Sequence, residues 1–296
     1  MKQFKKVAVL MGGPSTEREI SLRSGNAVAD GLRNAGYDVI EINIKDREFD
    51  VPDGVEAAFI ALHGEFGEDG EIQQILDKKG IPYTGSGSEA SRIAFDKKLS
   101  KEIFIQKGIP TPEYEILNRG EKRNFALPVV IKPLCQGSSI GIHRVLSECD
   151  WGQASEDTLS YEGSMIVEEY IKGRELTVGI IEDEALPVVE VVAPDEWYDY
   201  NAKYTKGTSR YLVPAPLDEE IKDACDKHGL DVFRALGCSG FARVDFRLSD
   251  NGKLYVLELN SIPGFTETSL LPMAAGEAGL DFSALCDRIM QTARLE

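Results

Sequence analysis

The chain has 296 residues, of which 42% are hydrophobic and 28% charged, a composition typical of a globular protein of about two domains. Its formal net charge of −17 argues against binding to nucleic acid or to an anionic membrane, so an anionic ligand would need local cations, backbone N–H groups or metal ions. The five cysteines show no CxxC spacing and the longest apolar run covers only residues 57–62, which predicts a reduced, cytoplasmic protein without a membrane span.

The first 85 residues alternate between strand and helix patterns. Apolar runs predict strands at residues 7–11, 39–44 and 57–62, and helical spacing predicts helices at residues 16–35 and 71–79. This alternation is typical of βαβ units with a parallel sheet, so a Rossmann-like domain is expected. The first strand is not followed by G-x-G-x-x-G, which disfavours an NAD-dependent dehydrogenase.

The rest of the chain combines helices with short strands and hairpins. Helices are predicted at residues 88–107, 218–236 and 282–293. Strands are predicted at residues 127–132, 140–145, 165–168, 176–181 and 186–192, and a hairpin joins residues 241–248 to 253–259 across Ser-Asp-Asn-Gly. The whole pattern indicates three compact α/β pieces.

The last hairpin carries polar residues on strands that are otherwise apolar. Period-two alternation places Glu258 and Asn260 on the face that begins with Leu254. On the partner strand Arg243 and Asp245 share one face, and pairing would bring the four polar residues together. Oxygen ligands without His or Cys suit Mg²⁺, and an arginine beside them suits a transferred phosphoryl group. The alternative is a solvated hairpin face with an Arg–Asp pair.

Other segments have features of a nucleotide site. Lys132 ends a buried strand directly before a Gly/Ser-rich loop at residues 137–141, whose backbone N–H groups could approach a phosphate. Lys97 and Lys203 are further candidates for phosphate contacts, and the turn within residues 166–175 could contact a nucleobase. Each signal is weak alone, since most such loops, turns and surface lysines bind nothing, and the Walker A pattern is absent.

Nine segments, taken together and in order, resemble the D-alanine–D-alanine ligases of the ATP-grasp superfamily over nearly the whole chain. The first five are GGPSTEREISLRSG (12–25), HGEFGEDGEIQ (63–73), GIPYTGSG (80–87), FDKKLSK (95–101) and VVIKPLCQGSSIGI (129–142). The other four are VEEYIKGRELTV (167–178), YDYNAKY (198–204), GFARVDF (240–246) and LELNSIPGFTETSLLP (257–272).

The resemblance implies an α/β ATP-grasp fold in three domains. A Rossmann-like N-terminal domain (1–85) would be followed by a central domain (86–172) and a C-terminal domain (173–296), with ATP held between the last two. The implied phosphate contacts are Lys97, Lys132 and Lys203, with Asn260 also close to ATP. The implied adenosine contacts are Glu168, Glu169, Ile171 and Glu175, of which Glu169 and Ile171 would act through their backbone. The implied ligands of two Mg²⁺ ions, with Mn²⁺ as an alternative, are Asp245, Glu258 and Asn260.

By the same resemblance, the reaction joins two D-alanines for peptidoglycan precursor synthesis. ATP would phosphorylate the first D-alanine to an acyl-phosphate, and the amine of the second would attack it, releasing phosphate beside ADP. Because an acyl-phosphate hydrolyses easily, a lid at about residues 195–210 is expected to exclude water.

The resemblance also implies roles in binding the two D-alanines. Glu17 would bind the first ammonium, although a carboxylate in a helix's first turn is also favourable by itself. Ser138 and Tyr204 would be linked with Glu17, and His63 would lie near the substrate. Arg243 and the backbone of Gly264 would act at the reacting carbonyl. Ser269 and Leu270 would bind the carboxylate of the second D-alanine.

Alternatives remain at this stage. Another ATP-grasp ligase is disfavoured by the set Glu17, Ser138 and Tyr204, which the general fold does not require. A ligase that joins D-alanine to D-lactate is disfavoured because depsipeptide-forming relatives characteristically carry phenylalanine at the position of Tyr204. A non-catalytic nucleotide sensor is disfavoured because the polar hairpin residues are all present. The family also suggests a homodimer formed through the N-terminal domain. Departures from the family pattern, such as Gln74 and Glu169, remove no implied catalytic side chain.

Overall fold

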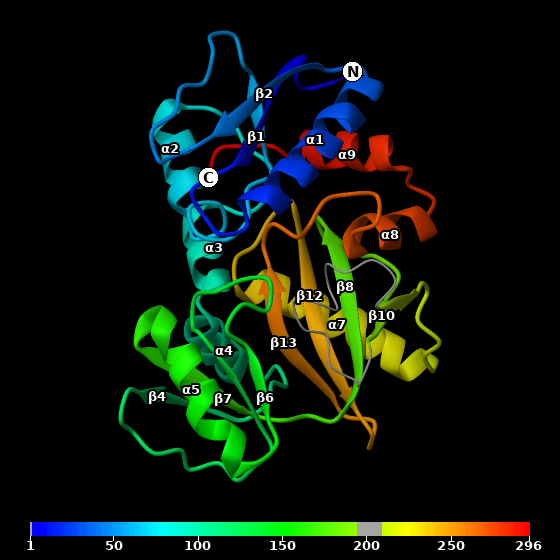
Figure 1. Cartoon of the computed structure of the whole chain (residues 1–296). Helices are drawn as coiled ribbons and strands as arrows, with labels where there is room; N and C mark the ends of the chain where they lie inside the picture. The colour runs from blue at the N-terminus through cyan, green and yellow to red at the C-terminus, as the bar shows by residue number, and fades with distance from the viewer. Residues whose placement is uncertain (1, 194–208) are drawn as a thin grey trace.

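The computed structural model describes residues 2–193 and 209–296 (Figure 1). The N-terminal part forms a parallel three-stranded sheet in the order β2-β1-β3, as the βαβ pattern predicts. Helix α1 packs against β1 of this sheet. The bounds are β1 Lys6–Gly12, α1 Arg18–Asn34, β2 Asp38–Ile44, β3 Ala57–Ile60 and α2 Glu71–Lys79.

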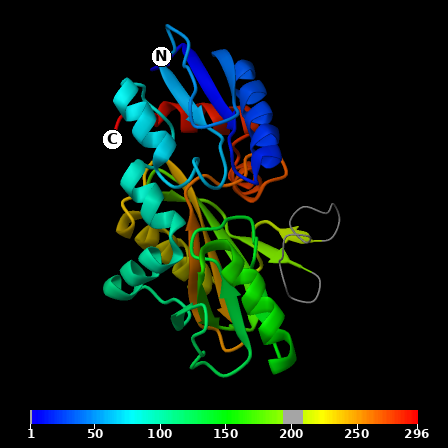
Figure 2. The ribbon, with the colours of Figure 1, turned by 60° about the vertical axis from the view of Figure 1, so that its left-hand side comes forward.

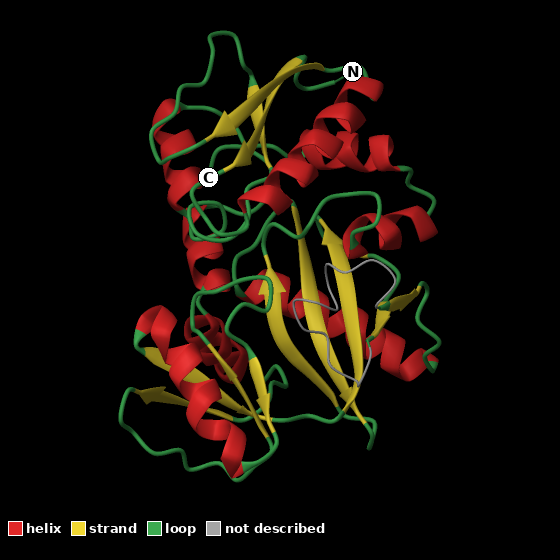
Figure 3. Ribbon diagram, in the orientation of Figure 1, coloured by secondary structure: helices red, strands yellow, loops and turns green. Residues whose placement is uncertain are grey.

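Two antiparallel sheets follow, and they form the lower part of Figure 3. The smaller sheet has the order β4-β7-β5-β6 and packs against helix α5. Its elements are β4 Tyr114–Asn118, β5 Val129–Lys132, β6 His143–Val145, α5 Glu148–Glu162 and β7 Ser164–Glu169. The larger sheet has the order β11-β10-β8-β12-β13, with β9 paired to β8. Its strands are β8 Gly173–Ile181, β9 Glu184–Ala185, β10 Val189–Val192, β11 Arg210–Leu212, β12 Phe241–Ser249 and β13 Leu254–Asn260.

The two faces of the larger sheet differ in chemistry. Helix α7 (Glu219–Ala235) packs on one face, where an apolar core includes Val178, Val244 and Phe246. The opposite face carries Arg243 and Asp245. Helix α8 also contacts β8, near Gly179, so the part of this face around Arg243 and Asp245 lies between α8 and the smaller sheet.

The C-terminal segment returns to the N-terminal sheet. Helices α8 (Leu270–Glu277) and α9 (Phe282–Gln291) follow β13, and α9 packs against α1 (Figures 1 and 2). A backbone bridge joins Tyr83 to Arg294, close to the chain's end. Each sheet lies within one of the three predicted segments. The last residues of the chain, however, pack against its first residues. The domain boundaries themselves stay a prediction.

One predicted helix is in fact two. In place of a single helix at residues 88–107, α3 (Ser88–Phe95) ends and α4 (Lys97–Lys107) begins at Asp96. Asp96 has an extended backbone, and its carboxylate accepts hydrogen bonds from the N–H groups of Lys98 and Leu99. Aspartate is a preferred N-cap because its side chain satisfies the free N–H groups of a helix's first turn. The prediction of one helix was therefore wrong, and the new helix starts with Lys97.

The expected side-chain alternation along β13 is also wrong. Asp245 pairs with Glu258, but its neighbour Phe246 pairs with Val256, so Leu257 is an extra residue in β13. Such a β-bulge shifts the alternation by one residue. Val256 therefore lies in the core under α7, whereas Glu258 and Asn260 lie with Asp245 on the opposite, polar face.

The packing of α1 on β1 leads to a stability prediction. A Cβ at Gly25 in α1 would lie 2.4 Å from Cβ of Met11 in β1. We expect Gly25→Ala to lower the free energy of unfolding by about 1–3 kcal/mol because the added methyl overpacks this contact. In the matched variant, Gly152→Ala in α5, the new methyl meets nothing within 4 Å, and stability should rise by about 0.5–1 kcal/mol. Urea unfolding measures both, and an equal gain in both variants would contradict the close packing.

Within the described residues, none of the helices is both long enough and apolar enough to cross a membrane.

Candidate active site

The polar face of the β12–β13 hairpin forms the centre of the candidate site. Arg243 lies opposite Asn260 in the strand register, and Asp245 lies opposite Glu258. Asp245 receives two hydrogen bonds of 2.8 Å from Arg243, one of 3.0 Å from Asn260 and one of 2.6 Å from the hydroxyl of Thr177 in β8. The predicted grouping of these four residues on one face is therefore confirmed by the register.

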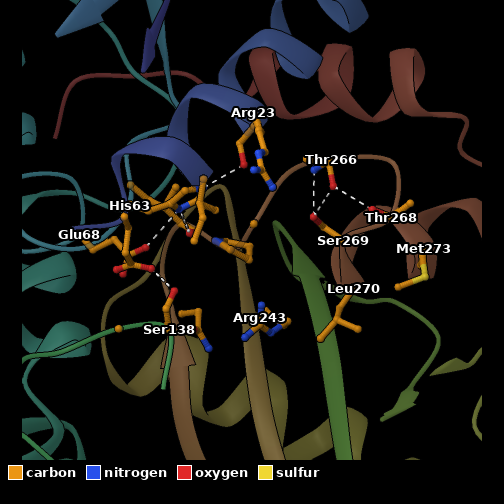
Figure 4. Close-up of a pocket in the computed structure, with 18 of the residues that line it drawn as sticks. Arg23, His63, Glu68, Ser138, Arg243, Thr266, Thr268, Ser269, Leu270 and Met273 are labelled. Carbon is orange, nitrogen blue, oxygen red and sulfur yellow. Dashed lines mark hydrogen bonds and ion pairs between the residues drawn. The ribbon is translucent and has the colours of Figure 1, made fainter. Parts of the chain in front are cut away.

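A large cavity of about 690 Å³ opens at one end of this hairpin (Figure 4). It is lined by α1, by the loops after β3 and β5, by the segment after β13, and by the start of α8. Its polar and charged lining residues are Glu17, Arg23, Ser24, His63, Glu68, Ser138, Ser209, Tyr211, Arg243, Asn260, Thr266, Thr268 and Ser269.

Glu17 and Ser138 meet in this cavity although 121 residues separate them in sequence. The hydroxyl of Ser138 donates a hydrogen bond to Glu17. Ser138 has φ of 50°, a left-handed conformation that serine seldom adopts. A Cβ on Gly137 would lie 2.7 Å from Oε2 of Glu17, so the glycine leaves room for this carboxylate, which is only 7% exposed.

His63 is held by protein groups at both ring nitrogens. Its Nδ1 lies 3.1 Å from the carbonyl oxygen of Ile262, which can only accept, so Nδ1 carries the proton. Nε2 lies 3.0 Å from the hydroxyl of Ser24, and Ser24 accepts from the N–H of Phe265 at 3.2 Å. These bonds connect α1 and the end of β3 to the segment that contains Gly264.

Glu68 is a further carboxyl group beside His63 and Glu17. Its Oε1 lies 3.5 Å from Nδ1 of His63. Burial raises the pKa of Glu68, the charge of Glu17 adds to this rise, and His63 opposes it. Two carboxyl groups, Glu17 and Glu68, thus lie at this end of the cavity, and a cationic group of a ligand bound there would favour their charged forms.

The opposite end of the cavity is formed by the start of α8. Ser269 precedes the helix, and its hydroxyl accepts from the N–H of Thr266 at 3.0 Å and lies 2.9 Å from the hydroxyl of Thr266 (Figure 4). The backbone of Leu270 begins the helix, whose N-terminus favours negative charge. The cavity thus offers carboxylates at one end and an anion-favouring helix terminus at the other.

A smaller cavity of about 80 Å³ lies further along the same hairpin, between the two antiparallel sheets. Its charged lining residues are Lys132, Glu168, Glu169, Glu175, Asp245, Arg247 and Glu258, and Ser139 of the Gly/Ser loop also contributes. Lys132 donates a 2.8 Å hydrogen bond to Glu168, and Nζ of Lys97 lies 3.4 Å from Glu258. Lys97 also donates to the carbonyl of Gln136 before the loop, at 2.7 Å.

The structure brings together most of the residues singled out in the sequence. The large cavity contains Glu17, His63, Ser138, Arg243, Asn260, Gly264, Ser269 and Leu270. The small one contains Lys132, Glu168, Glu169, Ile171, Glu175, Asp245 and Glu258. Lys203 and Tyr204, and nearly all of the expected lid, lie outside the described residues.

Sequence reasoning missed several residues of the site. Arg23, Ser24 and Glu68 line the large cavity, and Arg247 lines the small one. Lys101 is buried behind Glu168, with Nζ 3.2 Å from its Oε1. Lys101 lies four residues after Lys97 on one helix, a spacing that places both on a common face and could have indicated it.

Two antiparallel sheets that enclose a cavity lined by Lys132, Arg247 and carboxylates, joined to a parallel α/β sheet, define the ATP-grasp class of ligases. A family model described as "D-ala D-ala ligase C-terminus" matches residues 102–291, and one described as "D-ala D-ala ligase N-terminus" matches residues 46–86. The chain belongs to the D-alanine–D-alanine ligase family.

Curated relatives and solved structures agree with this assignment. The chain is 49% identical to a D-alanine–D-alanine ligase of Methylacidiphilum infernorum, over 98% of this chain and 96% of that one. It is 46% identical to one from Syntrophotalea carbinolica, over 99% and 97% of the two chains. A crystal structure of the Bacillus anthracis D-alanine–D-alanine ligase complexed with ATP is similar with a TM-score of 0.85 at 33% identity, covering 97% of each chain.

Proposed function

We propose that this chain catalyses the ATP-dependent ligation of two D-alanines to D-alanyl-D-alanine. One observation carries the proposal. The large cavity, with carboxylates at one end and a helix N-terminus at the other, meets the small cavity that contains Lys132 at the polar face of β12 and β13. A zwitterionic amino acid and a nucleotide bound in the two cavities would meet where Arg243 and Asp245 lie.

The charges of the large cavity suit an amino acid at each end. Glu17 would bind the ammonium of the first D-alanine, and Ser138 would hold that carboxylate in place. Ser269 and the backbone N–H of Leu270 would bind the carboxylate of the second D-alanine at the start of α8. Arg243 and the N–H of Gly264 would stabilise negative charge at the reacting carbonyl, as in an oxyanion hole. His63, whose ring is bound on both sides, would keep the segment with Gly264 in place.

The lining of the small cavity suits part of a nucleotide, since its volume of about 80 Å³ is below that of a whole ligand pocket. Lys132 in this lining, Lys97 beside Glu258, and Lys203 would contact phosphates, and residues 168–175 would hold the adenosine. The ATP-complexed relative at 33% identity supports a nucleotide site in this fold. Residues 1–85, 86–172 and 173–296 would then act as the three domains of the enzyme, with a lid at about residues 195–210.

The donor set on the hairpin fits Mg²⁺. Asp245 and Glu258 are half-buried cross-strand partners, and Asn260 adds an amide oxygen, so all three offer the hard oxygen ligands that Mg²⁺ prefers. Among the described residues no three His, Cys, Asp or Glu side chains form a metal cluster. Mg²⁺ commonly takes phosphate oxygens as further ligands. Bound there, Mg²⁺ would neutralise negative charge on the phosphates.

Two further features of the proposal concern the setting of the enzyme. All five cysteines are free thiols, which is usual for a protein of the reducing cytoplasm. A homodimer formed through the N-terminal domain is proposed from the family alone.

The proposal is tested by incubating the protein with Mg²⁺, ATP and D-alanine, with D-lactate, L-alanine and no-substrate controls. Phosphate release and the mass of the product are followed together. Equal amounts of D-alanyl-D-alanine and phosphate are the expected result. Phosphate release without the dipeptide would favour another ATP-grasp ligase, and neither product would favour a nucleotide sensor.

Tyr204 is proposed to set the choice of the second substrate. We expect Tyr204→Phe to raise the ratio of D-alanyl-D-lactate to D-alanyl-D-alanine formed from equal mixtures of D-lactate and D-alanine. The product ratio, measured by mass spectrometry from pH 6 to about 9, tests this role. A ratio identical to that of the wild type at every pH would refute it.

A further inference from the structure

Lys101 is a buried lysine that the proposed reaction does not use. Its side chain is only 1% exposed, and it does not line either cavity. Its Nζ lies 3.2 Å from Oε1 of Glu168 and 2.5 Å from the hydroxyl of Thr111, which in turn donates to the carbonyl of Val256 in β13. Burying an ammonium group is costly, so a lysine in this place needs a reason beyond packing.

Lys101 shares the carboxylate of Glu168 with a second lysine. Lys132 binds the other oxygen, Oε2, at 2.8 Å, and both Lys132 and Glu168 line the small cavity. Lys101 therefore lies on the far side of Glu168 from the cavity. One buried carboxylate is balanced by two ammonium groups, which leaves the cluster with one surplus positive charge beside the proposed phosphate site.

The other buried or half-buried carboxylates of the small cavity each have a cation of the described residues beside them. Lys97 lies beside Glu258, Arg243 beside Asp245, and Arg247 beside Glu175. Glu169 also lines the cavity but is exposed, where solvent screens its charge. In a chain of net charge −17, a surplus positive charge at this place would favour the binding of phosphates.

We propose that Lys101 is a positioning residue of the nucleotide site, which neutralises Glu168 from behind so that the charge of Lys132 remains available to a phosphate. The inference rests on the proposed ATP site. Without Lys101, Glu168 would pair with Lys132 alone, and the phosphate would compete with that carboxylate for a single cation. Lys101 would thus act through Glu168 and Lys132 without contacting the nucleotide.

The protonation state of Lys101 is consistent with this role at neutral pH. Burial lowers the pKa of Lys101 to about 8, although Glu168 opposes the shift, and Lys132 adds to it. The charged groups that face it are Glu168 on β7, Lys132 on β5 and Glu258 on β13, and its Nζ also lies 5.5 Å from the ring centre of Tyr114 on β4. The ammonium form predominates at pH 7 and is lost as the pH rises through 8.

The test is to compare adenosine with ADP as ligands, by calorimetry in the presence of Mg²⁺. For Lys101→Met, which keeps the length of the side chain, ADP should bind more weakly by a factor on the order of ten, the effect of a unit charge at about 10 Å in a medium of dielectric constant about 20. Adenosine affinity should change little. In the double variant Lys101→Met with Glu168→Gln, the carboxylate that pairs with Lys132 is gone, so the charge of Lys132 is again available to a phosphate. The ratio of ADP to adenosine affinity should then return toward the wild-type value.

Two controls separate this role from a structural one. Lys98→Met removes an exposed charge from the same helix and should leave both affinities unchanged. In the wild type the ratio of ADP to adenosine affinity should fall between pH 7 and 9, whereas in Lys101→Met it should stay flat. If Lys101→Met does not fold, Glu168→Gln alone should raise the ratio, because both lysines then lose their shared carboxylate.

The outcomes distinguish this inference from the proposed function. The inference is wrong if Lys101→Met weakens the binding of adenosine and of ADP equally, or weakens neither. It is also wrong if Glu168→Gln leaves the ratio of ADP to adenosine affinity unchanged. In each of these cases nucleotide binding by the wild type still stands. If the wild type binds neither ATP nor ADP, the proposed function fails first.

Discussion

Replacing Glu258 by glutamine is expected to reduce turnover by about three orders of magnitude while leaving the fold intact. The substitution keeps the shape of the side chain but removes the charge that would bind Mg²⁺ opposite Asp245, and a metal ion that neutralises phosphate charge contributes several kcal/mol to phosphoryl transfer. Phosphate release at several Mg²⁺ concentrations measures the loss. Turnover near that of the wild type at low Mg²⁺ would contradict the metal assignment.

The control for this variant is Glu190→Gln in strand β10 of the same sheet. Glu190 is buried and, like Glu258, ion-paired, with hydrogen bonds of 2.8 and 2.7 Å from Arg174, but it lines neither cavity. We expect some loss of stability and unchanged turnover. Thermal unfolding of both variants shows whether Glu258→Gln acts through the site or through the fold.

The second large effect is expected from a single added methyl group in the substrate cavity. In Gly137→Ala the new Cβ would lie 2.7 Å from Oε2 of Glu17. Because this atom is the end of a flexible side chain, Glu17 can turn away at little cost to stability, but it then no longer faces the first D-alanine. The KM for D-alanine should rise by roughly two orders of magnitude, the effect of breaking a buried ion pair.

The controls for Gly137→Ala are the affinity for ADP and the melting temperature, both of which should stay near wild-type values. Glu17→Gln should raise the KM for D-alanine as well, and the double variant should be little worse than either single variant, because both act on the same contact. Additive effects would show that Gly137 acts elsewhere.

Much of the fold follows from local sequence patterns. Period-two runs and helical spacing identify most of the strands and helices, because burial of one face dictates where apolar residues recur. The break at Asp96 cannot be predicted from apolar spacing, because that spacing continues across it. The side chain of Asp96 caps the second helix, and this cap separates the two helices. The capping hydrogen bonds of one side chain therefore determined this helix boundary, although the hydrophobic spacing indicated a continuous helix.

The chain's own sequence determined that β12 and β13 form a hairpin with acidic and amide groups at its end, because the turn residues and the alternation are local properties. Only the tertiary structure decided which face those groups occupy: the extra residue Leu257 reverses the alternation, and the choice depends on pairing with β12 and on the core under α7. In the same way, Glu17 meets Ser138, and Lys101 meets Glu168, across long sequence separations that no local pattern encodes. Contacts of this kind arise when separate elements pack to bury apolar surface, and this packing brings the polar groups of the site together.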